Sequence, residues 1–190
     1  MNRARFVTIA AAAILLPATA GAQQTPPAPQ TYTLAATLVR TYQNLQRNLT
    51  EAAEKMPETD YAFKPTTEVR PFGQLVAHVA LSQFGTCAAL KADPAPPHKD
   101  DKEEATRSKA ELVALLKASS DYCNPALTTL KDEDLTVLGK SGQNQIAKGL
   151  ALTGTNTHGN EMYGTMAVYL RLKGIVPPTT ERQNAAKKSQ

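Results

Sequence analysis

The sequence predicts an all-α fold, a four-helix bundle, and three observations support that prediction. Apolar residues recur at three- and four-residue steps along four long segments, which is the pattern of amphipathic helices. No convincing strand pattern is present, and only residues 136–138 hint at one. The two cysteines of the chain lie at matching depths in the second and third of these segments, as neighbouring helices of one bundle would place them.

Prolines and glycines separate the expected helices from one another. The four helical stretches cover about residues 34–56, 71–92, 106–130 and 144–172. Pro57 closes the first stretch, Pro71 suits the first turn of the second, and Gly174 stops the fourth. The four stretches together are long enough to build one hydrophobic core.

The first 22 residues are typical of a secretory signal peptide. Arg3 and Arg5 precede a short apolar run at 6–16, and residues 20–22 (Ala-Gly-Ala) supply the small-x-small pattern of a cleavage site. The run is too short to span a bilayer, and no later stretch is long and apolar enough to do so. We therefore expect cleavage after Ala22 and export, to the bacterial periplasm.

The mature chain then divides into three parts. Residues 23–32 are rich in proline and predict a flexible or extended tether, residues 33–178 hold the bundle, and residues 179–190 predict a flexible basic tail. Loss of Arg3 and Arg5 lowers the formal net charge from +4 to +2, with 19 basic against 17 acidic residues. No basic run is interleaved with aromatic residues, so the charge pattern gives no support for nucleic-acid binding.

The cysteines predict how the helices run. In an exported protein an isolated pair, Cys87 and Cys123, favours a disulfide. Cys87 lies 16 residues after Pro71, and Cys123 lies 17 residues after Thr106, so each is about 24–26 Å from the start of its helix. A bond between them requires parallel helices. With the long proline-rich link between helices 2 and 3, this predicts an up-down-down-up bundle with a long crossover between these two helices.

Two histidines are candidates for a metal site inside the bundle. His78 shares a helical face with Leu75, and His158 lies within the apolar stripe of the fourth helix. Inward histidines on different helices of a bundle are a typical platform for a metal. Cys87 is nine residues beyond His78, about 180° around the helix, and so points away from such a site. His98 lies in the proline-rich link and is expected to be solvated.

The order YAFKP…VRPFGQLVAHVA…C…C…NTHGNEMYGTMAVYLRLKGIVPP resembles the DinB/YfiT-like superfamily, particularly its exported members. The resemblance covers roughly residues 33–178. It implies a four-helix bundle and a site in which three histidines bind zinc or nickel, one on helix 2 and two in an HxxxH pair on helix 4. His78 matches the first ligand and His158 the second, whereas Met162 stands at the third position. Some relatives are thiol-dependent transferases that use the metal to activate a low-molecular-weight thiol.

Met162 leaves three interpretations of the site open. In the first, His78, His158 and Met162 are packed core residues of a protein without a metal. In the second, one divalent metal such as zinc is retained, and Glu161, about 60° around the helix from His158, or a water replaces the third imidazole. In the third, two imidazoles and a thioether form a softer set that suits copper.

These interpretations predict different functions. The first gives an exported bundle whose pocket takes a small-molecule ligand and carries out no catalysis. The alternative is a metal-dependent thiol transferase or hydrolase acting on a small molecule, with His78 and His158 as ligands. A homodimer through an exposed helix face is compatible with either. No GxSxG, Walker or Rossmann pattern is present in the sequence.

Overall fold

The structure is a computed structural model, and it describes residues 31–99, 107–141 and 143–189. The expected signal peptide and nearly all of the proline-rich tether lie outside the described residues. The elements of the bundle belong to a single unit that begins at Tyr32. Within the described ranges, no helix combines the length and the apolar character needed to cross a membrane.

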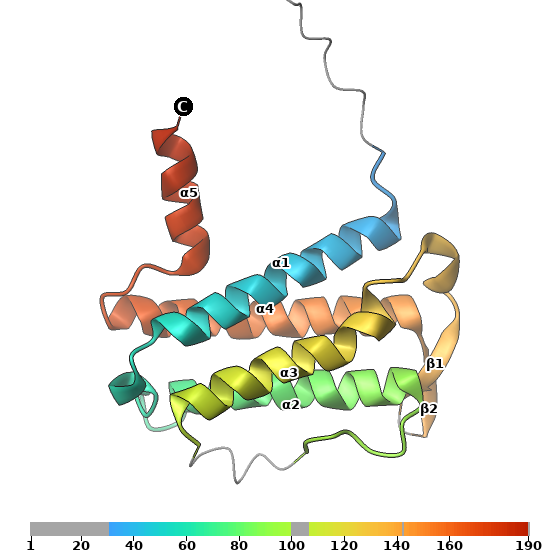
Figure 1. The fold of residues 1–190 in the computed structure, drawn as a ribbon, viewed down its shortest axis with the longest axis horizontal. Coiled ribbons are helices and arrows are strands. Elements are labelled where there is room, and N and C mark those ends of the chain that lie inside the picture. The colour runs from blue at the N-terminus through green and yellow to red at the C-terminus, as the bar shows by residue number, and fades with distance from the viewer. Residues whose placement is uncertain (1–30, 100–106, 142, 190) are drawn as a thin grey trace, which may run out of the picture. The chain divides into compact units, whose positions relative to one another are not determined.

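The described part of the chain contains five α-helices and one antiparallel hairpin (Figure 1). These elements are α1 (Leu34–Lys55), α2 (Phe72–Lys91), α3 (Lys109–Leu127), β1 (Leu138–Ser141), β2 (Asn144–Ala147), α4 (Lys148–Leu172) and α5 (Pro178–Lys188). The predicted, mostly helical class is confirmed, and the hairpin is a small sheet that the sequence analysis did not expect.

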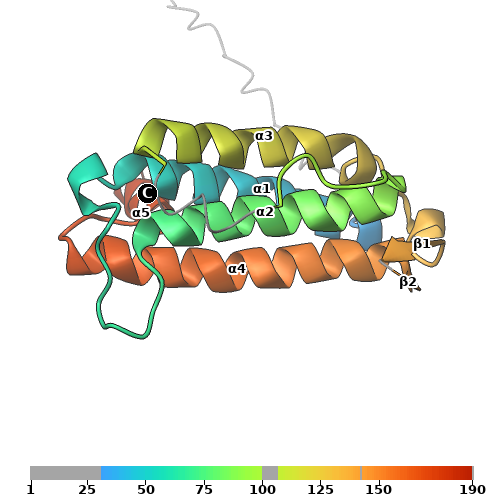
Figure 2. The same cartoon turned by 90° about the horizontal axis from the view of Figure 1, so that it is seen from below.

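The four long helices lie side by side (Figures 1 and 2). The most extensive contacts are between α2 and α3 and between α1 and α4. In Figure 1, α2 and α3 both end beside the hairpin, where α4 begins, and α1 and α4 both end at the opposite side. The disulfide between Cys87 and Cys123 is formed, with the Cα atoms 5.3 Å apart and both residues buried. The predicted pairing of the cysteines is therefore confirmed.

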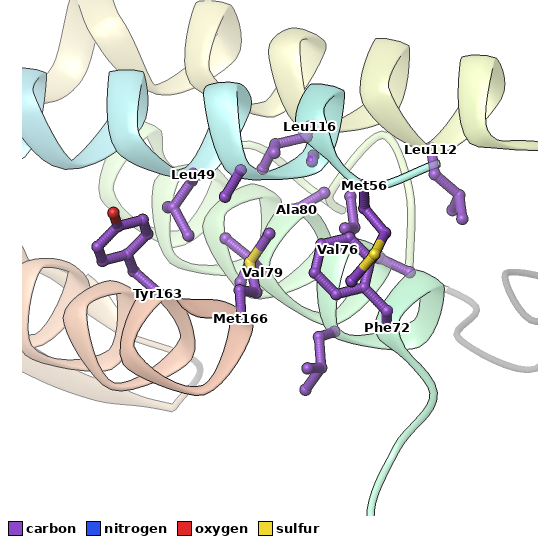
Figure 3. Close-up of a cluster of buried hydrophobic side chains, with 14 of the residues drawn as sticks. Leu49, Met56, Phe72, Val76, Val79, Ala80, Leu112, Leu116, Tyr163 and Met166 are labelled. Carbon is purple, nitrogen blue, oxygen red and sulfur yellow. The ribbon is translucent and has the colours of Figure 1, made fainter. Parts of the chain in front are cut away.

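The core fills the space between the four long helices. Phe72, Leu116 and Met166 are fully buried and come from α2, α3 and α4, and Leu49 of α1 meets them (Figure 3). Burying these apolar side chains together supplies most of the driving force for the fold. Ser108 begins α3 with a capping box, in which its side chain and that of Glu111 satisfy each other's backbone amides.

The start of the fourth helix differs from the prediction. Helix was expected from about residue 144, but residues 144–147 form β2 and pair with β1 in the register Leu138↔Ala147 and Ser141↔Asn144. Ile146 and Leu150 are four residues apart, which fits a helical stripe as well as it fits a short strand followed by a helix. Gly149 fixes the junction, because a Cβ atom there would lie 2.9 Å from the carbonyl oxygen of Leu135.

The C-terminal segment also differs from the prediction. A flexible tail was expected at 179–190, but residues 178–188 form α5. The Tyr163 hydroxyl lies 2.9 Å from Thr179 Oγ1, Lys55 forms a salt bridge of 2.9 Å with Glu181, and Arg182 bonds to side chains of α1. These contacts are polar, so hydrophobic periodicity, the main signal for a helix, gives no sign of them.

The tyrosines give the protein a pH dependence at alkaline pH. Burial raises the pKa of Tyr42 and Tyr61, and burial together with a hydrogen bond to Asp93 raises the pKa of Tyr122 to about 12. The folded chain thus holds these protons more tightly than the unfolded chain, whose tyrosines have the ordinary pKa of about 10. This contribution to stability is fully present below pH 10 and is lost as the pH rises through the folded pKa values.

We therefore expect the free energy of unfolding to fall from about pH 10 upward. Urea titrations at a series of pH values would measure it, and absorbance at 295 nm would count the phenolates in the folded state. The Tyr42→Phe variant is the control. It removes a buried hydroxyl that has no hydrogen-bond partner among the described residues, so we expect a shallower fall with little loss of stability at neutral pH. Ionisation of all six tyrosines in folded protein at pH 11 would contradict this account.

Candidate functional site

The structure brings the two predicted histidines together. His78 lies in the middle of α2 and His158 in the middle of α4, and both are half-buried. Their ring centroids are 5.1 Å apart, with the planes at 81°, which is an edge-to-face contact. Two residues 80 positions apart in the chain therefore share one place between α2 and α4.

One nitrogen of His158 is left without a partner. Its Nε2 atom is buried and makes no hydrogen bond to any described residue. Its Nδ1 atom lies 4.0 Å from Glu161 Oε2, and the Glu161 side chain is 72% exposed, so this contact contributes little to stability. A buried polar atom without a partner costs free energy, and Nε2 of His158 is such an unsatisfied atom among the described residues.

The residues around the pair do not complete a three-histidine metal site. Met162, one turn after His158, is half-buried and packs against the main hydrophobic cluster. Glu161 lies on the Nδ1 side of the His158 ring, whereas the unpartnered nitrogen is Nε2. Across the described ranges, His, Cys, Asp and Glu side chains form no group of three that could hold a metal ion. Two imidazoles are in place, and the described residues offer no third imidazole or carboxylate beside Nε2.

A cavity of about 360 Å³ adjoins His158. It lies between α2 and α4 and reaches the hairpin, where Lys140 and Ile146 contribute to its wall. Its walls include several small residues, among them Gly85 of α2 and Gly154 of α4. A Cβ atom at either glycine would have no other heavy atom within 4 Å, so the space beside them is open.

Sequence reasoning did not predict this cavity. The signal that could have found it is a run of small residues at helical spacing, at positions 82, 85 and 89 of α2 and 151 and 154 of α4. Small residues on a helix are equally typical of close helix packing. Only the placement of the hairpin decides that they line a cavity.

Buried polar side chains fix one wall of the cavity. Gln83, which lines it, donates from Nε2 to Gln46 Oε1 at 2.9 Å and accepts from Ser119 Oγ at 2.9 Å. Ser120 Oγ donates to the same Gln46 oxygen at 2.7 Å. This network joins α1, α2 and α3 beside the disulfide, where Cys123 Sγ lies 3.3 Å from the carbonyl oxygen of Gln83. Gln83 is thereby held in one orientation.

The third histidine lies elsewhere. His98 is exposed in the link after α2, and its ring centroid is 4.9 Å from that of Phe84. It is not among the residues that line the cavity. His98 is therefore a suitable control for experiments on the other two histidines.

Comparison with known proteins identifies the family. The sequence model of the DinB superfamily matches residues 41–161, well over half of the chain, from α1 into α4. The chain belongs to the DinB superfamily. This confirms the resemblance seen in the sequence. The matched range of this DinB protein includes both site histidines and ends one residue before Met162.

Solved structures have the same fold. A DinB-like protein from Bacillus cereus ATCC 10987 has a TM-score of 0.61 at 13% identity, covering 74% of this chain and 93% of the other. A DinB-like protein from Bacillus subtilis has a TM-score of 0.57 at 20% identity, covering 73% and 92%. The mycothiol-dependent maleylpyruvate isomerase has a TM-score of 0.56 at 12% identity, covering 69% of this DinB protein and 60% of the isomerase. Among curated proteins no match was found.

Proposed function

We propose that this DinB protein is an exported small-molecule-binding bundle whose cavity derives from a three-histidine metal site that has lost its third ligand. The observation that carries the proposal is the cavity of about 360 Å³ between α2 and α4, which is lined in part by His158. A concave, largely apolar space with a few polar groups is the usual form of a small-molecule site.

The donor set is the reason to separate this protein from a metalloenzyme. Zinc sites in proteins use three or four nitrogen, sulfur or oxygen ligands of the protein. Here Met162 is half-buried and packs against the hydrophobic core, and Glu161 lies on the other side of the ring from Nε2. Two histidine ligands, His78 and His158, would bind a metal more weakly than the three-histidine site of the family.

Export and helix order are part of the same proposal. The N-terminal residues are typical of a signal peptide, and disulfides such as Cys87–Cys123 are characteristic of oxidising compartments such as the bacterial periplasm. The up-down-down-up order is supported by the disulfide near the C-terminal ends of α2 and α3 and by the helix directions in Figure 1. A homodimer through an exposed helix face fits the same bundle, and light scattering would give the mass in solution.

Metal analysis of the mature protein tests the proposal. We expect protein purified from the periplasm, and then incubated with zinc or nickel, to carry far less than one metal per chain by mass spectrometry. The Met162→His variant places an imidazole one turn from His158 and restores the family set. We expect this variant to bind zinc at one ion per chain, because the scaffold and the other two imidazoles are unchanged.

The histidine variants show which outcome would contradict the proposal. If the wild-type protein holds one metal per chain, and His158→Ala abolishes it while His98→Ala does not, the metal site is intact and the proposal is wrong. Failure of Met162→His to gain zinc, in a variant that folds normally, would count against the derivation of the cavity from a metal site.

A second candidate function is a metal-dependent thiol transferase or hydrolase acting on a small molecule. Its support is the buried Nε2 of His158 beside the ring of His78 and the fold shared with a mycothiol-dependent isomerase. His78 and His158 would then bind one divalent metal, zinc or nickel, with Glu161 or a water as third ligand, or copper with the thioether of Met162. The intact-site outcome of the metal experiment would favour this function.

A further inference from the structure

We propose that the ligand of the α2–α4 cavity is a small organic anion with an apolar body, whose negative group lies at Lys140. This inference rests on the proposed function, because it concerns the same cavity. It adds the chemical class of the ligand and the residue that selects it.

The charges in the cavity wall favour an anion. Of the side chains that line it, Lys140 is the one that carries a full charge at neutral pH, and none is a carboxylate. The other polar side chains of the wall are the hydroxyls of Ser82, Thr86 and Thr155, the amide of Gln83 and the imidazole of His158. A single cation beside a wall of apolar groups and polar groups without a carboxylate attracts an anion, and no negative group of the wall would repel that anion.

The hairpin holds Lys140 at this position. Lys140 is exposed on β1 and lies opposite Gln145 of β2. Its neighbour Gly139 allows the strand to approach α2 closely, because a Cβ atom there would lie only 3.2 Å from Leu90 Cδ2. The salt bridges of the described residues do not include Lys140. Its ammonium group is thus not neutralised by any carboxylate in the described ranges.

The size of the cavity sets the size of the ligand. Along α4 the cavity runs from Leu150, near the hairpin, to Gly159, and nine residues of helix span about 14 Å. A volume of about 360 Å³ and this length suit an apolar body of up to three rings or a short alkyl chain. An anion at Lys140 would direct that apolar body toward His158.

A pair of fluorescent probes with the same apolar body tests the inference. The probe 8-anilinonaphthalene-1-sulfonate carries a negative group, and N-phenyl-1-naphthylamine is its uncharged counterpart. We expect Lys140→Met to lower the affinity for the sulfonate probe about fivefold, which is the effect of losing one partly exposed ion pair. Lys140→Glu should lower this affinity further. The uncharged probe should bind the wild type and both variants equally. Lys187→Met, which removes an exposed lysine of α5 that does not line the cavity, should leave both probes unchanged.

A cavity-filling variant separates this inference from the proposed function. Gly154→Phe places a large side chain in open space on the cavity wall. We expect it to lower the affinity for both probes strongly. Suppose that Gly154→Phe lowers the affinity for both probes but the Lys140 variants bind the sulfonate probe as the wild type does. The inference of an anionic ligand is then wrong, and the proposed small-molecule-binding function is retained. If Gly154→Phe affects neither probe, or neither probe binds the wild type, the proposed cavity function fails as well. Near-ultraviolet circular dichroism of each variant would verify that it is folded.

Discussion

Replacing Cys87 and Cys123 together with alanine should lower the free energy of unfolding by about 4 kcal/mol. The disulfide closes a loop with a sequence separation of 36 residues, and in the chain-entropy model a loop of this length restricts the unfolded chain by about that amount. Urea denaturation of the wild type and of the double variant would measure the difference. The loss is a large fraction of the total stability of a domain of this size, so we expect a much lower midpoint of urea denaturation.

Reduced wild-type protein is the control for this experiment. Both cysteines are fully buried, so reduction requires unfolding in the presence of a thiol followed by refolding. Reduced wild type and the double alanine variant should then have similar stability. A difference of less than about 1 kcal/mol between oxidised wild type and the variant would show that the bond does little to restrict the unfolded chain. Two reactive thiols in unfolded, unreduced protein would contradict the disulfide itself.

The substitution Gly159→Leu should destabilise the protein by about 2–3 kcal/mol. A Cβ atom at Gly159 would lie 2.5 Å from Leu45 Cδ2 and 3.3 Å from its Cγ atom. Leu45 is only 2% exposed, so its side chain has no free space to occupy. Accommodating the new side chain therefore requires α1 and α4 to move apart, which loosens the pair of helices beside His158. Thermal or urea unfolding would measure the loss.

Gly164→Leu is the matched control for Gly159→Leu. Gly164 lies in the same helix, is exposed, and has no heavy atom within 4 Å of a Cβ position. Leucine there should stabilise the helix by roughly 0.5–1 kcal/mol because glycine is a poor helix former. Equal effects of the two substitutions would mean that close packing of α1 on α4 is not what requires glycine at position 159.

Some residues of the candidate site were predicted from the sequence, and others were recognised only in the structure. His78 and His158 were identified from their positions on two apolar stripes, because an imidazole among leucines is conspicuous in a sequence. Lys140, Gly85 and Gly154 were not identified. A lysine in a short polar segment and glycines in a helix have many structural explanations. Which of these applies depends on the segments that lie beside them.

The elements that were not predicted, the hairpin and α5, both lack a hydrophobic periodicity long enough to be recognised. The four long helices were found within a few residues because apolar spacing repeats over five or more turns in each. The hairpin at 138–147 has four residues a strand, too few for a period of two to be distinguished from a helical start. Helix α5 is attached to the bundle by polar contacts of Arg182, Glu181 and Thr179. Such contacts leave no hydrophobic periodicity in the sequence from which a helix could be predicted.

The sequence by itself determined the helical class, the family, the disulfide and the two histidines of the site, because periodicity and motifs are local properties of the chain. The tertiary structure alone decided where the hairpin and α5 pack, that Met162 packs against the core, and that residues of α2, α4 and the hairpin line a cavity beside Lys140 and His158. These features depend on contacts between residues far apart in sequence. Such contacts form when the apolar stripes are buried together, and no short stretch of sequence encodes them.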